Sequence, residues 1–164
     1  GVGAFPAASQ RMQAAGLDQA VKEFAKAGKP LLGICLGMQL LLDESSEISP
    51  SRGLGLVSGS VVRINETHGV KLPHTNWCSL HFVSQKPSTL FHGVCDGASV
   101  YFSHSYQCML HDHSLVTSTC SLHDENSFPL TASIGSENVL GVQFHPEKSG
   151  SLGLTILKNF CASS

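Results

Sequence analysis

The chain alternates between segments with helical spacing and short, continuously apolar segments. Residues 6–27 carry apolar side chains at helical intervals and end at Gly28, which predicts one helix or two. Residues 30–34 form a short apolar run that is typical of a buried parallel strand. Residues 36–43 return to helical spacing. The pattern therefore predicts a strand, a sharp turn and a helix in direct succession.

Beyond a polar loop at residues 45–52, the pattern changes to short β segments and a closing helix at 155–160, so the chain is predicted to have an α/β fold. Two of these segments are expected to form a hairpin around the turn Asp112-His113-Ser114. No repeat or long linker divides the chain, so residues 1–164 are expected to form a single domain. The predicted strands are 54–57, 60–64, 81–83, 100–103, 106–110, 115–122, 130–134 and 139–144.

Composition narrows the classes of function. The 164 residues include 10 Lys+Arg and 12 Asp+Glu, a formal charge of −2 that argues against nucleic acid or an anionic membrane as partner. The longest apolar run, 31–42, is interrupted by glycines and is too short to span a bilayer, and residues 1–6 lack the basic start of a signal peptide. Only 13% of residues are charged, so part of the neutral surface is expected to be covered by a partner.

The six cysteines are widely spaced and form no Cys-x-x-Cys pair, which favours a reduced, cytoplasmic protein. The series Cys108, His111, His113, Cys120 and His123 has roughly the spacing of a zinc site. The two halves of the series lack tight glycine turns, so we expect no metal and interpret the histidines as exposed residues at the hairpin turn.

The segment Gly33-Ile-Cys35-Leu-Gly37 lies where the predicted strand turns into a helix. Flanking glycines at such a turn hold a nucleophile out above a sheet, here a Cys in place of Ser. The start of the helix favours a thiolate, and the backbone N–H of Leu36 points to where an oxyanion would form. The alternative is an inert buried cysteine, and this motif alone does not decide between the two.

A second motif, Gly141-Val-Gln-Phe-His145-Pro-Glu147, closes the last predicted strand. Side chains two residues apart in extended backbone point the same way, so His145 and Glu147 are expected to lie side by side. A thiol nucleophile needs a base, and the base needs an orienting carboxylate. Taken alone, the motif also fits a surface turn, but with Cys35 it completes a Cys-His-Glu triad at the carboxyl edge of a parallel sheet.

These two motifs, the first extended to Gln39, resemble the triad-type, class I glutamine amidotransferases. Further segments resemble one group of them, the glutaminase subunits of imidazole glycerol phosphate synthase in histidine biosynthesis. The resemblance implies a doubly wound, mostly parallel sheet with an added antiparallel portion. The segments are Gly1-Val-Gly-Ala-Phe5, Gly53-Leu-Gly55, Pro73-His74-x-x-Trp77 and Tyr101-Phe-x-His104-Ser105-Tyr106.

The resemblance implies that Cys35 attacks the carboxamide of L-glutamine while His145, held by Glu147, moves the protons, so that glutamate and ammonia are released without a cofactor. It also implies that Val2 and Gly3, together with the Leu36 N–H, hold the oxyanion. The positions that match substrate-binding residues are Gln39, Glu47, Ser105 and Tyr106.

Family members pass their ammonia to a (β/α)8-barrel cyclase in a heterodimer. The matching interface positions are Asn76, Trp77, Tyr101 and Lys148, and Trp is the residue most enriched at binding hot spots. The family segment Pro-His-Met-Gly-Trp has Thr75-Asn76 here in place of Met-Gly, a change that we expect to affect coupling to the partner more than the glutaminase chemistry.

Two other functions stay open at this point: a glutaminase that serves another acceptor, as in surface-sugar synthesis, and a non-catalytic fragment. The resemblance also places Gly1 inside a loop that should follow a parallel strand. We therefore expect roughly 45–50 residues of strand and helix before it, and the domain to be truncated at its N-terminus. Such a fragment is expected to expose an apolar sheet edge and to fold poorly alone.

Overall fold

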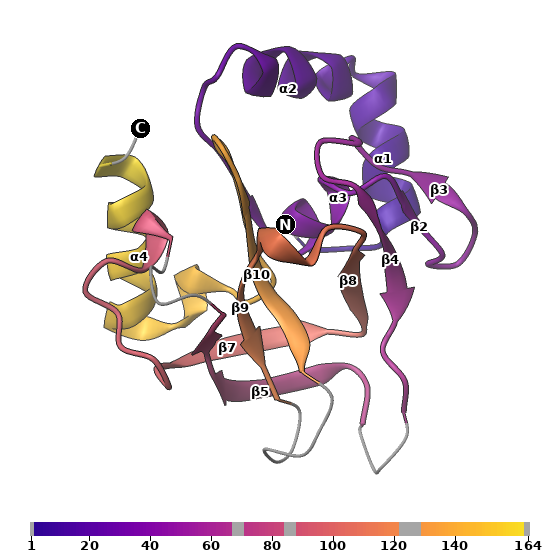
Figure 1. The fold of residues 1–164 in the computed structure, drawn as a ribbon. Coiled ribbons are helices and arrows are strands. Elements are labelled where there is room, and N and C mark those ends of the chain that lie inside the picture. Colours follow the sequence, from indigo (N-terminus) through magenta and orange to yellow (C-terminus); the bar gives the residue numbers. More distant parts are fainter. Residues whose placement is uncertain (1, 67–70, 84–87, 122–128, 163–164) are drawn as a thin grey trace.

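A computed structural model describes residues 2–66, 71–83, 88–121 and 129–162 (Figure 1). Within these residues, no helix combines the length and the apolar character needed to cross a membrane. The α-helices are α1 (Phe5–Ala14), α2 (Leu17–Lys26), α3 (Leu36–Leu40) and α4 (Gly150–Ala162), and the short 3-10 turns are η2 (Thr89–Phe91), η3 (His113–Leu115) and η4 (Pro146–Lys148).

The central element is a five-stranded sheet with the strand order β1-β11-β10-β9-β6. Its first pair, β1 and β11, is parallel, and the other pairs are antiparallel. β1 forms one edge of this sheet in the described part of the chain, and the expectation that further strands precede Gly1 stays a prediction. The strands are β1 (Leu31–Ile34), β6 (His81–Phe82), β9 (Val116–Cys120), β10 (Leu130–Ser136) and β11 (Val139–Val142).

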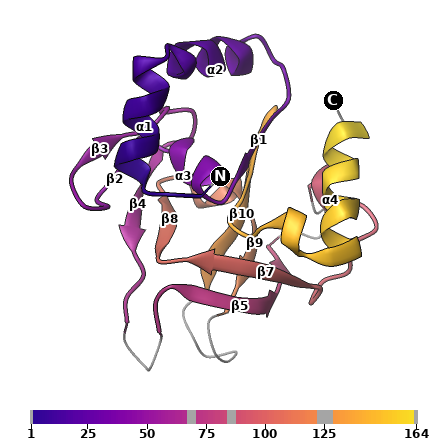
Figure 2. The same ribbon diagram turned by 180° about the vertical axis from the view of Figure 1, so that it is seen from behind.

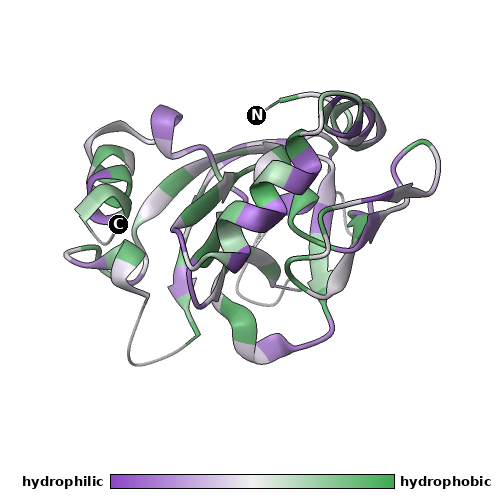
Figure 3. Ribbon diagram, turned by 90° about the horizontal axis from the view of Figure 1, so that it is seen from above, coloured by the Kyte–Doolittle hydropathy of each residue, from purple (hydrophilic) through white to green (hydrophobic). Residues whose placement is uncertain are grey.

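Two smaller sheets flank the central one (Figure 2). A four-stranded sheet has the order β3-β2-β4-β8, and a two-stranded antiparallel ribbon joins β5 to β7. Hydrophobic residues recur along the central strands, whereas the outer helices carry mixed residues (Figure 3). The bounds are β2 (Glu44–Ser45), β3 (Ser51–Arg52), β4 (Gly59–Arg63), β5 (His74–Ser79), β7 (Ser99–His104) and β8 (Tyr106–Leu110).

Side chains of the central sheet enter two separate cores. Val139 of β11 packs with Phe5 of α1 and with α3 in the first core. Val142, on the same strand, packs with Phe144 and with Ile156 of α4 in the second core. Because successive side chains of a strand point to opposite faces, the sheet is covered by α1 and α3 on one face and by α4 and the β5–β7 ribbon on the other.

Two glycines allow α3 to lie directly on the sheet. Gly33 of β1 and Gly141 of β11 are register partners. A Cβ built on Gly33 would lie 2.7 Å from backbone atoms of Gly37, and one on Gly141 would lie 2.8 Å from Cγ of Met38. Any larger residue would push α3 away from the sheet, so this pair determines how closely the turn at Cys35 follows the strand.

The expected strand-turn-helix unit is confirmed, and so is the parallel pairing of the strands that precede Cys35 and His145. Residues 6–27 form two helices, because Gly16 adopts a left-handed conformation between them. The closing helix is longer than the 155–160 predicted, since α4 begins at Gly150. Residues 54–57 form no strand, although Leu54 and Val57 are buried in the first core.

The predicted hairpin of residues 106–110 and 115–122 is wrong. Both segments contain strands, but β8 pairs with β4 and β9 pairs with β10 and β6. Cys108 and Leu110 of β8 pack into the first core, whereas Cys120 of β9 packs into the second. The two segments therefore lie in different sheets, although Val116 of β9 also packs against the first core. The strand β5 was not predicted, because its sequence His-Thr-Asn-Trp-Cys-Ser is largely polar.

We expect Gly33→Ala to lower the free energy of unfolding by about 1–3 kcal/mol, because the methyl group meets backbone rather than a movable side chain. Gly37→Ala is the matched control: its Cβ meets nothing within 4 Å and lies within α3, so we expect it to be neutral or stabilising by about 0.5–1 kcal/mol. Urea unfolding of both variants measures the difference. Equal stabilities would contradict this account of the glycine pair.

Candidate active site

Cys35 lies at the sharp turn between β1 and α3. Its backbone has φ +50° and ψ −108°, a conformation that side-chain-bearing residues seldom adopt. Its N–H donates to the carbonyl of Val142 at 2.7 Å, which extends the pairing of β1 with β11. The carbonyl of Cys35 accepts from Gln39 N–H at 3.2 Å inside α3. The strained turn is therefore held from both sides, as a nucleophile elbow requires.

The Cys35 thiol is buried and contacts Gln143. Nε2 of Gln143 donates to Sγ at 3.6 Å, and Sγ lies 4.0 Å from the carbonyl oxygen of Ser103. Burial raises the pKa of the Cys35 thiol, and the hydrogen bonds from the Leu36 backbone and from Gln143 oppose that rise. The thiol is therefore neutral in the resting site and needs a base to become a nucleophile.

His145 and Glu147 lie side by side after β11, as expected. Nδ1 of His145 lies 2.6 Å from Oε1 of Glu147, so Nδ1–H donates to the carboxylate and Nε2 is left free to accept a proton. Burial is the largest single influence and raises the pKa of Glu147, but the hydrogen bond from His145 and the other favourable interactions of the carboxylate together lower the pKa, which keeps the carboxylate charged. Among the described residues no hydrogen bond joins Sγ of Cys35 to the His145 ring.

Ser149 fixes the His145 turn to the neighbouring ribbon. Its Oγ donates to the carbonyl of His145 at 2.7 Å and accepts from Tyr101 N–H at 3.0 Å. His145 N–H in turn donates to the Tyr101 carbonyl at 2.8 Å. His145, only 1% exposed, is therefore positioned by β7 as well as by β11.

A pocket of about 490 Å³ opens above Cys35. All seven residues expected to act on the oxyanion or the substrate line it, because the α1 start, α3 and the β7–β8 turn meet here. Gln39 donates from Nε2 to the carbonyl of Tyr106 at 3.3 Å and to Oε1 of Gln143 at 3.0 Å. Glu47 accepts from Phe5 N–H at 2.8 Å. The expected residues in the lining are Val2, Gly3, Leu36, Gln39, Glu47, Ser105 and Tyr106, with Leu36 beside Cys35 at the elbow.

Three of the four expected interface residues form one group. The rings of Trp77 and Tyr101, register partners in the β5–β7 ribbon, lie 6.0 Å apart, and Nζ of Lys148 lies 5.7 Å from the Tyr101 ring centre. Trp77 is 51% exposed. Asn76 occupies the opposite face of β5, and its Oδ1 accepts from the N–H of Trp77.

Sequence reasoning assigned no role to Gln143, His104 or Arg63. Gln143 is fully buried although it continues an apolar strand, and a polar residue in such a run is the signal that would have identified it. His104 lines the pocket, and its Nδ1–H donates to the Tyr106 carbonyl at 2.7 Å. Its Nε2 is buried and has no hydrogen-bond partner among the residues that the structure describes, and burial lowers the pKa of His104 to about 4. Arg63 also lines the pocket and pairs with Glu66.

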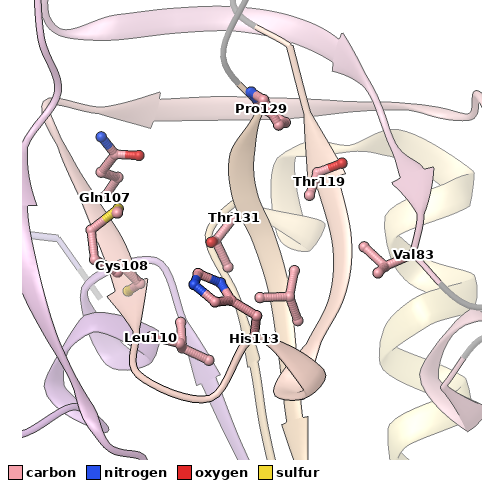
Figure 4. Close-up of a pocket in the computed structure, with 10 residues that line it drawn as sticks. Val83, Gln107, Cys108, Leu110, His113, Thr119, Pro129 and Thr131 are labelled. Atoms are coloured by element: carbon pink, nitrogen blue, oxygen red, sulfur yellow. The ribbon is translucent and has the colours of Figure 1, made fainter.

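A second pocket, of about 350 Å³, separates β8 from β9 and β10 (Figure 4). Cys108 and His113 reach it from different elements, and Cys120 is buried in the other core. Nδ1 of His111 contacts Ser58 Oγ at 3.1 Å. In the described ranges no three His, Cys, Asp or Glu side chains are grouped as a metal would need, and His123 lies outside those ranges.

Comparisons with known proteins agree with this geometry. The family model for class-I glutamine amidotransferases matches residues 5–163. The chain is 43% identical to the imidazole glycerol phosphate synthase subunit HisH of Listeria innocua, over 98% of this chain and 73% of that protein. It is 44% identical to the HisH subunit of Moorella thermoacetica, over 98% of this chain and 72% of that protein.

Among solved structures, PurLQS from Thermotoga maritima matches with a TM-score of 0.64 and 18% identity, over 90% of this chain and 68% of that one, which is a likeness of fold. The family model spans the elbow cysteine and the His-Pro-Glu turn together, and the relatives cover nearly every residue between them. The chain therefore belongs to the class-I glutamine amidotransferase family, among the relatives of the HisH subunits of imidazole glycerol phosphate synthase.

Proposed function

We propose that this chain is a glutaminase subunit that hydrolyses L-glutamine to glutamate and ammonia with the triad Cys35, His145 and Glu147. The ammonia passes to a partner cyclase that makes imidazole glycerol phosphate in histidine biosynthesis. The observation that carries the proposal is the short hydrogen bond between His145 and Glu147, next to the strand that ends at Cys35. The names of the HisH relatives favour this acceptor over a surface-sugar precursor.

The proton path follows from the tautomer of His145. With Nδ1–H donated to Glu147, Nε2 takes the thiol proton as Sγ attacks the carboxamide carbon of glutamine. The tetrahedral oxyanion is held by the backbone N–H of Leu36 and by the Val2–Gly3 segment. His145 then returns the proton to the departing nitrogen, the C–N bond breaks and a thioester forms. Water activated by the same imidazole hydrolyses the thioester to glutamate.

The charges of the pocket suit an α-amino acid. Glu47 offers a carboxylate to the α-ammonium group, and Arg63 offers a guanidinium to the α-carboxylate from the same lining. Gln39 donates to the Tyr106 carbonyl and to Gln143, and Gln143 contacts Cys35. Gln39 therefore fixes the pocket wall relative to the thiol. Opposite charges and a thiol in the same lining favour glutamine over ligands that lack the α-amino acid group.

Ammonia that reached water at neutral pH would be protonated and lost as a nucleophile, so a partner must cover the exit. Trp77 and Lys148 are exposed beside the His145 turn, and the half-buried Tyr101 is bonded to that turn through Ser149. An exposed aromatic group with a neighbouring cation is typical of interface hot spots. We assign this group to the docking face of a (β/α)8-barrel cyclase.

The complex with the cyclase should form a single adduct with an electrophilic glutamine analogue, and peptide mass spectrometry should find it on Cys35. Cys35→Ala should abolish the adduct and lower glutaminase turnover by at least about a thousandfold. Cys108→Ala is the control, because that thiol is fully buried in the first core. An adduct that persists in Cys35→Ala would contradict the assignment of the nucleophile.

Gln143→Met keeps the length of the side chain but removes the donor to Sγ. We expect iodoacetamide to alkylate Cys35 about tenfold more slowly at neutral pH, because the thiolate loses a charge-assisted hydrogen bond and the thiol pKa rises. Gln107→Met is the matched control, since Gln107 lies on β8 beside the second pocket. The rate at Cys35 is followed by peptide mass spectrometry. Equal rates in both variants would contradict a role of Gln143 at the thiol.

Trp77→Ala should weaken association with the cyclase by about thirtyfold or more, the effect of losing one hot-spot aromatic residue. Met109→Ala is the control, because Met109 is also an exposed apolar side chain but lies on β8. Titration calorimetry of each variant against the cyclase gives the dissociation constants. An unchanged constant for Trp77→Ala would remove this group from the interface.

A further inference from the structure

We infer that Glu47 is a positioning residue, whose carboxylate holds the Val2–Gly3 segment over Cys35 through the first amide of α1 while it receives the α-ammonium of the substrate. The contact that points to this is the hydrogen bond from Phe5 N–H to Oε2 of Glu47, 2.8 Å long and spanning 42 positions of the sequence. The role of Glu47 in binding the α-ammonium group rests on the proposed glutaminase function. Its role in holding Phe5 does not, because that hydrogen bond is present in the structure.

The start of α1 has no cap of its own. Ala4 precedes the helix and offers no side-chain acceptor, Pro6 has no N–H, and the first turn contains no acidic residue. Free N–H groups at the start of a helix carry partial positive charge, so a carboxylate there is favourable. Glu47 supplies that acceptor from a loop far along the chain, and α1 therefore begins where Glu47 holds Phe5.

The loop that carries Glu47 is itself held in place. The N–H of Glu47 donates to Oγ of Ser45 at 3.1 Å, and its carbonyl accepts from Ser49 N–H at 2.6 Å. Ser45 is buried and pairs with Val61 in the parallel β2–β4 ladder. The loop of Glu47 is thus attached to the β2–β4 pair, and the carboxylate fixes the start of α1 relative to these strands.

The segment just before this contact belongs to the pocket. Val2 and Gly3 line it together with Cys35 and Glu47. Val2 is 79% exposed and Gly3 has φ +121°, a conformation in which only glycine is unstrained. Phe5, by contrast, is fully buried in the first core. The bond at Phe5 N–H therefore marks the boundary between the core and the segment whose backbone must meet the oxyanion.

One carboxylate can serve both groups at once. A carboxylate has two oxygens with about four acceptor sites, and Phe5 uses one of them on Oε2. Among the described residues Oε1 has no hydrogen-bond partner, and Glu47 lines the pocket. An α-ammonium group bound at Oε1 would contact the same carboxylate that holds the Val2–Gly3 segment. Glu47 therefore affects both how tightly the substrate binds and where the oxyanion-binding backbone lies.

Two substitutions separate these roles. Glu47→Gln keeps a carbonyl oxygen for Phe5 N–H but removes the charge, so we expect KM for glutamine to rise at least tenfold while kcat stays within about twofold. Glu47→Ala removes both, so kcat should also fall, by about tenfold or more. Glu44→Ala is the control, because Glu44 is an exposed carboxylate on the neighbouring strand β2. Glutaminase assays use the complex with the cyclase.

Hydrogen exchange at the Phe5 amide gives a readout that needs no substrate. Exchange should be about tenfold faster in Glu47→Ala than in the unsubstituted protein and nearly unchanged in Glu47→Gln and Glu44→Ala. Equal kcat in the Gln and Ala variants, or Phe5 exchange that Glu47→Ala leaves unchanged, would overturn the inference. If the unsubstituted complex had no glutaminase activity, the proposed function would be overturned. The exchange measurement would still test whether Glu47 holds the Phe5 amide.

Discussion

The close contact between α3 and the paired glycines of β1 and β11 is the constraint on which the site depends. Gly33 and Gly141 face the helix without side chains, so the helix begins immediately after the strand. That proximity forces the strained, positive-φ backbone of Cys35 and turns its thiol above the sheet edge. The same parallel pair leads into the His145 turn, so one packing contact brings Cys35 and His145 to a common edge of the sheet.

Buried polar groups connect the parts of the site that come from different strands. Gln143 contacts both Cys35 and Gln39, and Gln39 reaches the Tyr106 carbonyl to which His104 also donates. Each of these groups would be costly to bury alone, and the shared hydrogen bonds offset that cost. Cys35 and the pocket wall are therefore positioned as one unit, which explains why amide side chains occupy positions that the apolar pattern assigns to the core.

Most of the local structure, and the three residues proposed as a triad, could be predicted from the sequence. The glycines around Cys35 and the His-Pro-Glu turn predicted the elbow and the His145–Glu147 contact, because both depend on residues close in the chain. The pairing of the strands was harder to predict. β8 and β9 follow each other with a turn between them, yet they belong to different sheets. Periodicity shows which side of a strand is apolar but not which of two cores receives it.

Sequence alone determined which residues carry the proposed chemistry, since Cys35 between two glycines and His145 two positions before Glu147 stand out in short local motifs. Only the tertiary structure decided which distant groups support them. Gln143 reaches the thiol across the sheet, and Glu47 caps a helix that begins 42 positions earlier. Such contacts form where separate elements meet in space, and the two partners have no characteristic separation in the sequence from which the contact could be predicted.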